Sequence, residues 1–228
     1  MSDLGVYLDR PIVSVNADNT EYMPETAWNY ELGSRFAKGN LRAEANLYRM
    51  DVTNQQLTVF PPGMSTGRMM TNAGKSRSSG LETELEWRHG KFHTRASYSF
   101  CDARFVEYND GNDDYSGQRL PYIPEHTIYL SAGQGIPIGE KTLHVEAGAK
   151  GAGPIRWNEN GTFYEPLRLA FDAGISMSFG KVELYIRGTN LSDIRNNVFY
   201  FKSMGHEFLA LSKPRILTAG IIFKQTQK

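Results

Sequence analysis

Side chains able to do chemistry are scattered along this 228-residue sequence and form no recognisable catalytic motif. We expect no metal site of the H-x-x-x-H type among the histidines, and no Ser–His–Asp or Cys–His arrangement has a local signature. The lone Cys101 excludes an intrachain disulfide and any zinc site built from several cysteines. The sequence therefore gives no reason to predict an enzyme. We expect polar positions in a wall or in loops for the five histidines, which are His89, His93, His126, His144 and His206.

Two acidic stretches have the residue types that bind a cation or exchange a proton. The stretch from Asp110 to Asp114 is rich in oxygen ligands for Ca²⁺, but it lacks the EF-hand pattern and its closing Glu. Glu82, Glu84 and Glu86 alternate along one segment, yet no defined partner for acid–base work accompanies them. The glycine-rich stretch 148–153 lacks the spacing of a phosphate-binding loop. We expect a solvated turn and wall-lining carboxylates, without a metal or a cofactor.

The elements that position these residues have a two-residue period. From Leu167 to Phe179 every odd position is apolar, whereas the even positions carry small or polar residues. A β-strand sends successive side chains to opposite faces, so one face of this segment is apolar and the other polar. The pattern predicts a strand with lipid on one side and water on the other.

Nine such segments can be identified, and they predict an all-β fold, an antiparallel meander of about nine long strands. Short glycine-bearing turns at 38–40, 89–91, 137–140 and 180–181 are typical of hairpins. Longer irregular stretches at 58–67, 109–119, 157–162 and 192–214 alternate with them, as turns and loops do at the two ends of outer-membrane barrels. The segments are Thr26–Ala37, Leu41–Leu57, Arg68–Trp87, Phe92–Tyr108, Leu120–Gly133, Thr142–Arg156, Phe163–Phe179, Val182–Leu191 and Arg215–Phe223.

The predicted faces agree from strand to strand. Leu81, Leu85 and Trp87 would share one face, and the three glutamates between and beside them would share the other. Carboxylates are costly against lipid but not in a hydrated interior, which favours a partial transmembrane β-barrel. A soluble or surface-attached β-rich module that binds carbohydrate or peptide alternates in the same way and stays open as a second hypothesis. Its strands average about 5–6 residues, shorter than these segments.

Composition narrows the function classes further. The 25 basic and 25 acidic residues leave no net charge to attract nucleic acid. The mean hydropathy is −0.46, and no stretch approaches the roughly 18 apolar residues of a membrane helix. The first residues, 1–7, resemble no signal peptide. For an outer-membrane protein we therefore expect this chain to be a piece of something longer.

Five phrases stand in a fixed order along the sequence. They are PETAWNYELG at 24–33, Asn72-Ala-Gly74 with SGLETE at 79–84, LPYIPEH at 120–126, RGTNLSD at 187–193 with Tyr200, and Pro214-Arg215 through Phe223. Together they resemble the C-terminal half of the barrel in TonB-dependent outer-membrane receptors. The resemblance implies structural roles for Glu31, Gly33, Asn72, Gly74, Gly80, Glu82, Glu84, Asn190, Asp193, Arg215 and Phe223.

The resemblance also implies a domain organisation and a function. Residues 1–25 would be the remnant of an extracellular loop, 26–223 the barrel strands and 224–228 a periplasmic tail, with the plug domain absent. The parent receptor would take up a scarce nutrient across the outer membrane of a Gram-negative bacterium. The nutrient that the resemblance implies first is an iron–siderophore complex. Its partners would be outer-membrane lipid, the barrel-assembly machinery and, through the missing N-terminal part, the TonB complex. The piece alone is not expected to transport.

Ligand-binding residues are expected at the extracellular mouth. Arginine and aromatic side chains suit an anionic or aromatic ligand through charge pairing and stacking. The alternative for the same residues is loop packing and an upper aromatic girdle. The residues concerned are Tyr108, Tyr115, Arg119, Arg156, Trp157 and Tyr164.

Overall fold

The structure, a computed structural model, describes residues 23–59, 69–72, 74–110, 113–203 and 206–224. Within these residues the chain forms strands and loops, and no helix long and apolar enough to cross a membrane. The strands are β1 (Thr26–Lys38), β2 (Leu41–Thr53), β3 (Gln56–Val59), β4 (Met69–Asn72), β5 (Lys75–His89), β6 (Phe92–Glu107), β7 (Pro124–Ile138), β8 (Lys141–Arg156), β9 (Tyr164–Glu165), β10 (Ala170–Phe179), β11 (Val182–Thr189), β12 (Asn197–Ser203), β13 (His206–Leu211) and β14 (Ile216–Phe223).

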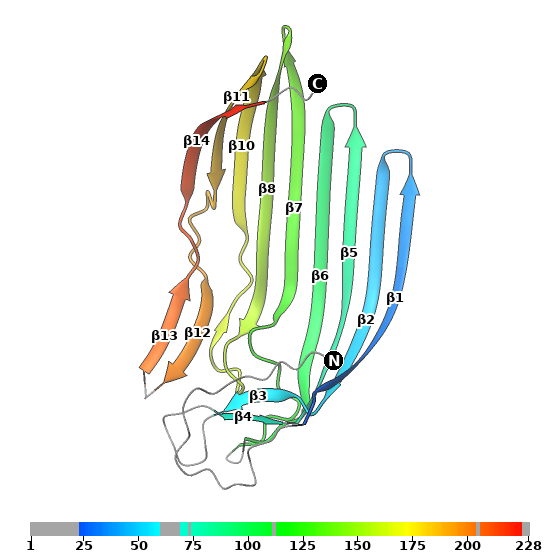
Figure 1. The fold of residues 1–228 in the computed structure, drawn as a ribbon, viewed down its shortest axis with the longest axis vertical. Helices are drawn as coiled ribbons and strands as arrows, with labels where there is room; N and C mark the ends of the chain where they lie inside the picture. The colour runs from blue at the N-terminus through cyan, green and yellow to red at the C-terminus, as the bar shows by residue number, and fades with distance from the viewer. Residues whose placement is uncertain (1–22, 60–68, 73, 111–112, 204–205, 225–228) are drawn as a thin grey trace.

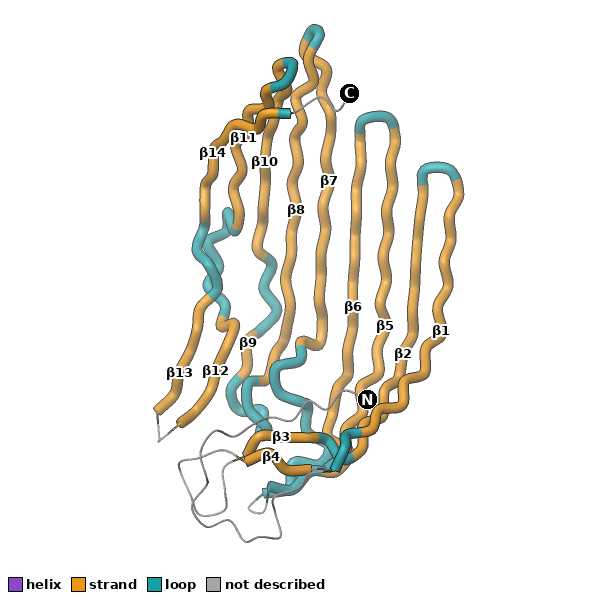
Figure 2. Tube along the Cα trace, in the orientation of Figure 1, coloured by secondary structure: helices purple, strands orange, loops and turns teal. Residues whose placement is uncertain are grey.

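Nine strands form one long sheet in the order β1-β2-β5-β6-β7-β8-β10-β11-β14, and the short β9 pairs with β8 (Figures 1 and 2). Each neighbouring pair on this path is antiparallel. The hairpins β3–β4 and β12–β13 interrupt the path in sequence and form two small separate sheets. The predicted all-β meander of about nine long strands is confirmed.

Four tight turns lie together at one end of the sheet, which we call the short-turn end. Each contains a glycine with a positive φ, namely Gly39, Gly90, Gly139 and Gly180. A glycine tolerates this left-handed backbone without steric cost, so it closes the turn in few residues. The opposite end, which carries the longer connections and both small hairpins, is the long-loop end (Figure 1).

Two predicted strands were too long because the chain breaks near the long-loop end. The segment Leu41–Leu57 ends its sheet pairing at Thr53, and Asn54 then adopts a φ of 54°. The segment Arg68–Trp87 is divided at Gly74, which has a φ of 80°. Both breaks turn the chain out of the sheet, so β3 and β4 pair with each other instead.

Other boundaries also differ from the prediction. The segment Phe163–Phe179 divides into β9 and β10, and only Ala170–Phe179 belongs to the long run. Strand β7 begins at Pro124 and continues through Pro137, which the sequence placed in a turn. Pro137 is tolerated because β6 pairs with β7 only as far as Gln134, so no neighbour requires its missing N–H on that side. The stretch 192–214, predicted irregular, contains the hairpin β12–β13.

The register produces alternating rows of apolar and polar residues across the sheet. One row crosses seven strands as Phe36–Ala43–Leu85–Ala96–Leu130–Ala149–Phe171. The adjacent row, on the other face, is Arg35–Glu44–Glu84–Ser97–Tyr129–Lys150–Ala170. We call these faces the apolar face and the polar face. Their separation confirms the predicted alternation of faces.

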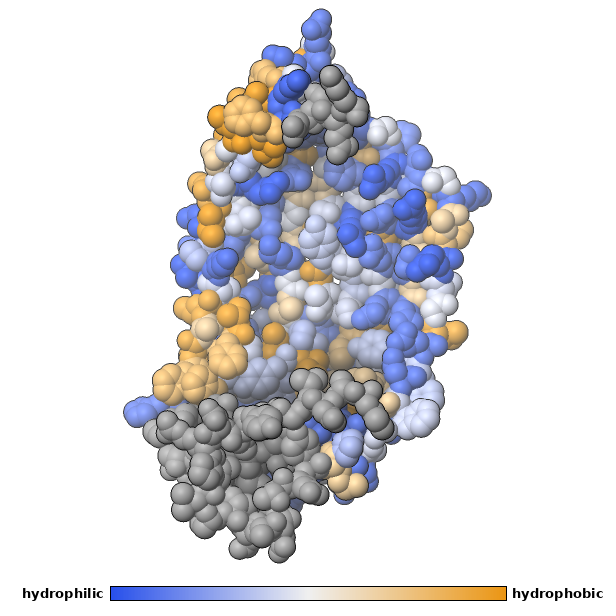
Figure 3. Space-filling view, in the orientation of Figure 1, coloured by the Kyte–Doolittle hydropathy of each residue, from blue (hydrophilic) through white to orange (hydrophobic). Residues whose placement is uncertain are grey.

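Large apolar side chains remain exposed on the apolar face. Leu32, Phe36, Phe171 and Ile186 are each at least half exposed. Figure 3 shows hydrophilic side chains over the middle of the sheet on the side turned to the viewer, with hydrophobic ones at the β11–β14 edge. In the described chain the other two sheets have only two strands each, so no second sheet covers this surface. The described residues therefore lack the two packed sheets of a β-sandwich.

The predicted terminal segments lie mostly outside the described residues. Of the loop remnant 1–25 only 23–25 are described, and of the tail 224–228 only Lys224 is described. Strands β1 and β14 form the two edges of the sheet.

Candidate ligand-binding mouth

The buried core of the described chain lies at the long-loop end, where loops cover the polar face. Ala103 and Phe105 are each 2% exposed, and they pack with Tyr108 and Leu120. The ring of Phe105 lies 4.6 Å from that of Tyr108, which in turn stacks on Tyr115 at 5.5 Å. Two of the predicted mouth residues, Tyr108 and Tyr115, are thus brought together as part of a packed loop core.

Both phenols of this core stay neutral at physiological pH. Burial raises the pKa of Tyr108 to about 12, with Glu159 and Asp110 adding to the effect. Burial and Asp110 likewise raise the pKa of Tyr115 to about 12. Because Glu159 acts on both rings, the loop that follows β8 lies close to the loop that follows β6.

A second aromatic cluster joins the β8–β9 loop to the hairpin β12–β13. The ring of Trp157 meets Tyr122 edge-on at 5.5 Å, and the Tyr122 hydroxyl donates to the carbonyl of Tyr200 at 2.7 Å. Tyr200 packs against Phe163 at 4.7 Å. Trp157 is 4% exposed, and its Nε1 meets no hydrogen-bond acceptor among the described residues.

Glu165 binds the same hairpin at the first residue of β12. This carboxylate is 6% exposed and accepts hydrogen bonds from the backbone N and the Nδ2 of Asn197, at 3.3 and 2.7 Å. Arg168 lies 3.9 Å from its other oxygen. A buried carboxylate that is satisfied in this way fixes the position of Asn197, where β12 begins.

Arg156 and Tyr164 form the exposed aromatic–cation pair of the mouth. They are register partners between β8 and β9, and the Arg156 guanidinium lies 4.9 Å from the centre of the Tyr164 ring. Tyr164 is 53% exposed. Along β8, Arg156 lies an even number of residues from Lys150 and Glu146, so it shares the polar face with them.

The six predicted mouth residues therefore occupy different positions. Tyr108 and Trp157 are buried in loop packing, Arg119 pairs with Asp102 and Glu125, and Arg156 with Tyr164 remains open. The sequence did not point to Tyr122, Phe163 or Glu165, or to Phe199, whose ring lies 6.4 Å from that of Tyr122. It also gave Tyr200 no part in the mouth. The aromatic run at 198–201, followed by the apolar run at 208–211, is the signal that could have revealed the hairpin.

No described cluster of His, Cys, Asp and Glu has the three or more members that would hold a metal ion. His89 and His93 do have the H-x-x-x-H spacing, but the turn at Gly90 separates them onto opposite faces. In the acidic loop, Asp110 accepts from the backbone N of Asp113 at 2.8 Å, and Asp114 accepts from that of Ser116 at 2.9 Å. These carboxylates cap their own turn.

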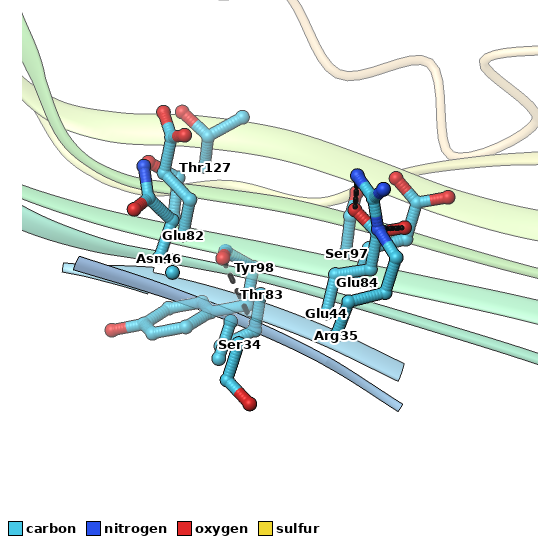
Figure 4. A pocket seen from close by; sticks show the side chains of 13 residues that line it. Ser34, Arg35, Glu44, Asn46, Glu82, Thr83, Glu84, Ser97, Tyr98 and Thr127 are labelled. Carbon is cyan, nitrogen blue, oxygen red and sulfur yellow. Dashed lines mark hydrogen bonds and ion pairs between the residues drawn. The ribbon is translucent and has the colours of Figure 1, made fainter. Parts of the chain in front are cut away.

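The polar face carries a shallow hollow across β1, β2, β5 and β6 (Figure 4). Asn46, Glu82 and Glu84 project into it, whereas Ser34 and Tyr98 point to the other side of the strands. Arg35 Nε pairs with Glu44 at 2.7 Å, and Arg95 pairs with Glu84 at 2.8 Å. The remaining lining residues are Gly33, Ala45, Thr83, Ser97, Ser99 and Thr127.

Rings lie over glycines on this face. A Cβ on Gly80 would come within 2.6 Å of the Tyr48 ring, and one on Gly220 within 2.6 Å of the Tyr185 hydroxyl. Gly133 is covered in the same way by His93. Each ring therefore covers the backbone of a neighbouring strand at a position where only glycine leaves room for it.

The sequence motifs at 187–193 and 214–223 meet in one hydrogen-bond network in the connection between β11 and β14. Asn190 Nδ2 donates to the carbonyls of Ile194 and Lys213, at 2.9 and 3.0 Å. Asp193 accepts from the backbone N of Arg215 at 2.8 Å. This hydrogen bond lowers the pKa of Asp193, and Arg195 and Arg215 lower it further. The network closes the long connection between β11 and β14.

The other phrase residues also have local tasks. Asn72 Nδ2 donates to the carbonyls of Met23 and Asn54, both at 2.8 Å, and so ties three segments together. A Cβ on Gly74 would lie 1.7 Å from the Glu107 carbonyl oxygen. Glu31 accepts from Asn29 on the polar face, and Phe223 ends the edge strand 78% exposed.

Comparison with known proteins identifies the fold. The sequence matches the family model described as TonB dependent receptor-like, beta-barrel, over residues 5–191. The chain belongs to this family. The resemblance recognised in the sequence is thereby confirmed.

The named relatives of this TonB-dependent barrel are receptors as well. It is 28% identical over 116 residues to the pesticin receptor of Yersinia enterocolitica, covering 50% of this chain and 16% of the relative. It is 23% identical over 224 residues to the probable TonB-dependent siderophore receptor PiuA of Acinetobacter baumannii, covering 92% and 28%. The ferric yersiniabactin uptake receptor FyuA of Yersinia pestis superposes with a TM-score of 0.76 at 19% identity, covering 89% and 30%. The chain spans less than a third of the length of these proteins.

Proposed function

We propose that this chain forms part of the wall and extracellular mouth of a receptor that imports a ferric siderophore, and that it is not an enzyme. The observation that carries the proposal is the open pair of Arg156 and Tyr164 on the polar face at the long-loop end. A guanidinium beside an exposed ring suits a ligand that is both anionic and aromatic.

The names of the relatives support this cargo class, since they include a siderophore receptor and a ferric yersiniabactin uptake receptor. The unpaired indole N–H of Trp157 adds a donor next to the hairpin β12–β13, and a buried donor without an acceptor costs about 1–3 kcal/mol. Small movements of the hairpin would offer that donor to an oxygen-rich ligand.

Within this proposal the chain supplies wall and outer loops, while energy comes through the TonB complex by way of a plug domain. Insertion would require the barrel-assembly machinery and contact with outer-membrane lipid. Residues 1–25 would belong to an extracellular loop and 224–228 to a periplasmic tail, and the barrel piece alone would not transport.

Uptake of ⁵⁵Fe as a panel of ferric siderophores tests the proposal in cells that carry the complete receptor gene. Arg156→Ala should weaken binding of the transported complex about 10-fold or more, because a charge-assisted contact contributes roughly 1.5–3 kcal/mol. Arg88→Gln, at the short-turn end, is the matched control. Uptake that survives Arg156→Ala and Tyr164→Leu together, or no uptake of any ferric siderophore, would contradict the proposal.

A further inference from the structure

Three arginines stand side by side in one cross-strand row near the long-loop end. Asp51 of β2 is the register partner of Arg77 on β5, Arg77 is the partner of Arg104 on β6, and Arg104 bridges to Arg119. Like charges directly opposite one another destabilise a sheet unless something of opposite sign lies between them. Four arginines gather here, Arg49 being the fourth, and they pair with three carboxylates, Asp51, Asp102 and Glu125, so one positive charge is left over for an anion.

The row belongs to the apolar face. Arg77 alternates with Ser76 and Ser78, which are 4% and 8% exposed on the polar side. Arg104 alternates in the same way with Ala103 and Phe105, both 2% exposed. The guanidiniums thus point away from the barrel interior and toward the surroundings of the barrel.

The row also lies at the depth of lipid headgroups. From Trp87, at the short-turn end of the same face, Arg77 is ten residues along β5, or ~34 Å of strand at ~3.4 Å per residue. With the ~40° tilt of barrel strands this distance is ~26 Å across the membrane, close to the ~25 Å of the apolar band. On the same face, the second row from the arginines holds Phe100 and His126, beyond the row of Ser79 and Asp102. The Tyr98 hydroxyl lies 2.9 Å from His126 Nδ1, so aromatic side chains gather here as at an aromatic girdle.

The groups nearby leave part of both central guanidiniums exposed, although Arg104 Nη1 also donates to the carbonyl of Gly117 at 3.1 Å. Asp51 contacts Arg77 through Nε at 2.6 Å and Arg49 through Nε at 2.9 Å. Asp102 contacts Arg104 through Nε at 2.9 Å and Arg119 at 3.1 Å. Both Asp residues contact their arginine through Nε. The side chains of Arg77 and Arg104 remain 45% exposed. Such oriented guanidiniums match a phosphate better than a lysine would.

We propose that Arg77 and Arg104 form a clamp for a phosphate group of an outer-leaflet lipid, with Asp51 and Asp102 as the residues that orient it. The long loops of outer-membrane barrels face the outside, so the lipid is a phosphorylated glycolipid of that leaflet. The inference depends on the orientation of the barrel and not on its cargo.

Native mass spectrometry in detergent provides the test, with the full protein purified from its own outer membrane. The probes are diphosphoryl lipid A, monophosphoryl lipid A and inorganic phosphate. We expect the wild type to bind the diphosphoryl form more tightly than the monophosphoryl form. Arg77→Gln with Arg104→Gln should lower that affinity ~5-fold for each arginine removed. Lys141→Gln with Arg88→Gln, at the short-turn end, removes the same charge and should leave the affinity unchanged.

Arg77→Lys with Arg104→Lys keeps the charge and should lose part of the affinity. This variant still tests the proposal if the double Gln variant fails to fold. Heat-dependent gel mobility reports whether each variant is a folded barrel. Equal binding by the wild type and the folded Gln or Lys variant would overturn the proposal, as would equal loss in the short-turn control. Competition by millimolar inorganic phosphate without any preference for lipid would also overturn it. Iron uptake is scored separately, so failure of the clamp and failure of the cargo assignment are distinguishable.

Discussion

The ring of Tyr48 lies over Gly80 of the adjacent strand, where a Cβ would come within 2.6 Å of it. The same site is bounded by the carbonyl oxygen of Phe100, 2.2 Å from that Cβ position. At Gly220 the three nearest atoms all belong to the Tyr185 side chain. Two similar ring–glycine pairs thus differ in what blocks a larger residue, backbone at Gly80 and a movable ring at Gly220.

This difference predicts unequal costs for two alanine substitutions. Gly80→Ala should destabilise the protein by ~1–3 kcal/mol, because a backbone carbonyl has to shift, and Tyr48→Ser should not restore stability. Gly220→Ala should be rescued when Tyr185→Ser is added, since the ring alone obstructs it. Urea unfolding in detergent micelles measures both cycles. Rescue of Gly80→Ala by Tyr48→Ser would show that the carbonyl is not the obstacle.

Two glycines with the same left-handed backbone should also differ. Gly39 has a φ of 57° and nothing within 4 Å of its Cβ position, so Gly39→Ala should cost only the ~1–2 kcal/mol of the backbone conformation. Gly74 has a φ of 80° and the Glu107 carbonyl 1.7 Å from that position, so Gly74→Ala should cost more and lower the yield of folded barrel. Folded yield and urea midpoint for the pair check this, and equal effects would contradict it.

Removal of the Glu165 carboxylate should loosen the hairpin β12–β13. Glu165→Ala leaves two donors of Asn197 without their acceptor, a local cost of ~1–3 kcal/mol. Hydrogen exchange of the β12 amides should therefore accelerate, while β6 stays protected. Glu207, which accepts only a 3.4 Å bond from Tyr200 Oη, is the control. Unchanged protection of β12 in Glu165→Ala would be the contrary result.

The connection between β11 and β14 should weaken at acid pH. The pKa of Asp193 is held below its ordinary value of 3.8, chiefly by the backbone N–H of Arg215. A depressed pKa means that the charged carboxylate stabilises this connection above the ordinary value, and that this contribution disappears as the pH falls through the lowered pKa. The protection factor of the Arg215 amide should fall in that range.

Asp193→Asn keeps an acceptor and tolerates the φ of 52°, so it should flatten the acid decline of the Arg215 protection factor. Asp114→Asn changes another carboxyl of lowered pKa in a different loop and should leave Arg215 unaffected. An identical acid profile in wild type and Asp193→Asn would exclude the carboxylate as the cause.

The strands were predictable because a two-residue period and glycine turns are local signals. The alternation of Leu81, Leu85 and Trp87 with three glutamates assigned the faces of β5 correctly. The ends at Asn54 and Gly74 were not predictable from the period, since the apolar pattern continues through them into β3 and β4. There the backbone conformation of single residues, and not hydrophobic patterning, decides where a strand stops.

The mouth was predicted less well because its geometry depends on contacts between distant loops. Tyr122 reaches Tyr200 across 78 positions, and Glu165 reaches Asn197 across 32. Residue type alone selected Tyr108 and Trp157, which burial turns into packing residues. It also selected Arg156 and Tyr164 but could not show that they would be neighbours.

The directions of the two edge strands, β1 and β14, determine whether an odd or an even number of further strands can close the sheet into a barrel. The nine strands of the path alternate in direction, so β1 and β14 point the same way and leave matching rows of backbone donors and acceptors. If all neighbours in the closed ring are antiparallel, the first and last added strands must both run opposite to β1 and β14. These two strands therefore run parallel to each other, so the number of added strands is odd. A 22-stranded ring, the usual size of plugged outer-membrane transporters, satisfies this rule with an odd complement. Insertion or deletion of a single strand on either side would break the closure, whereas the addition of a whole hairpin would preserve it.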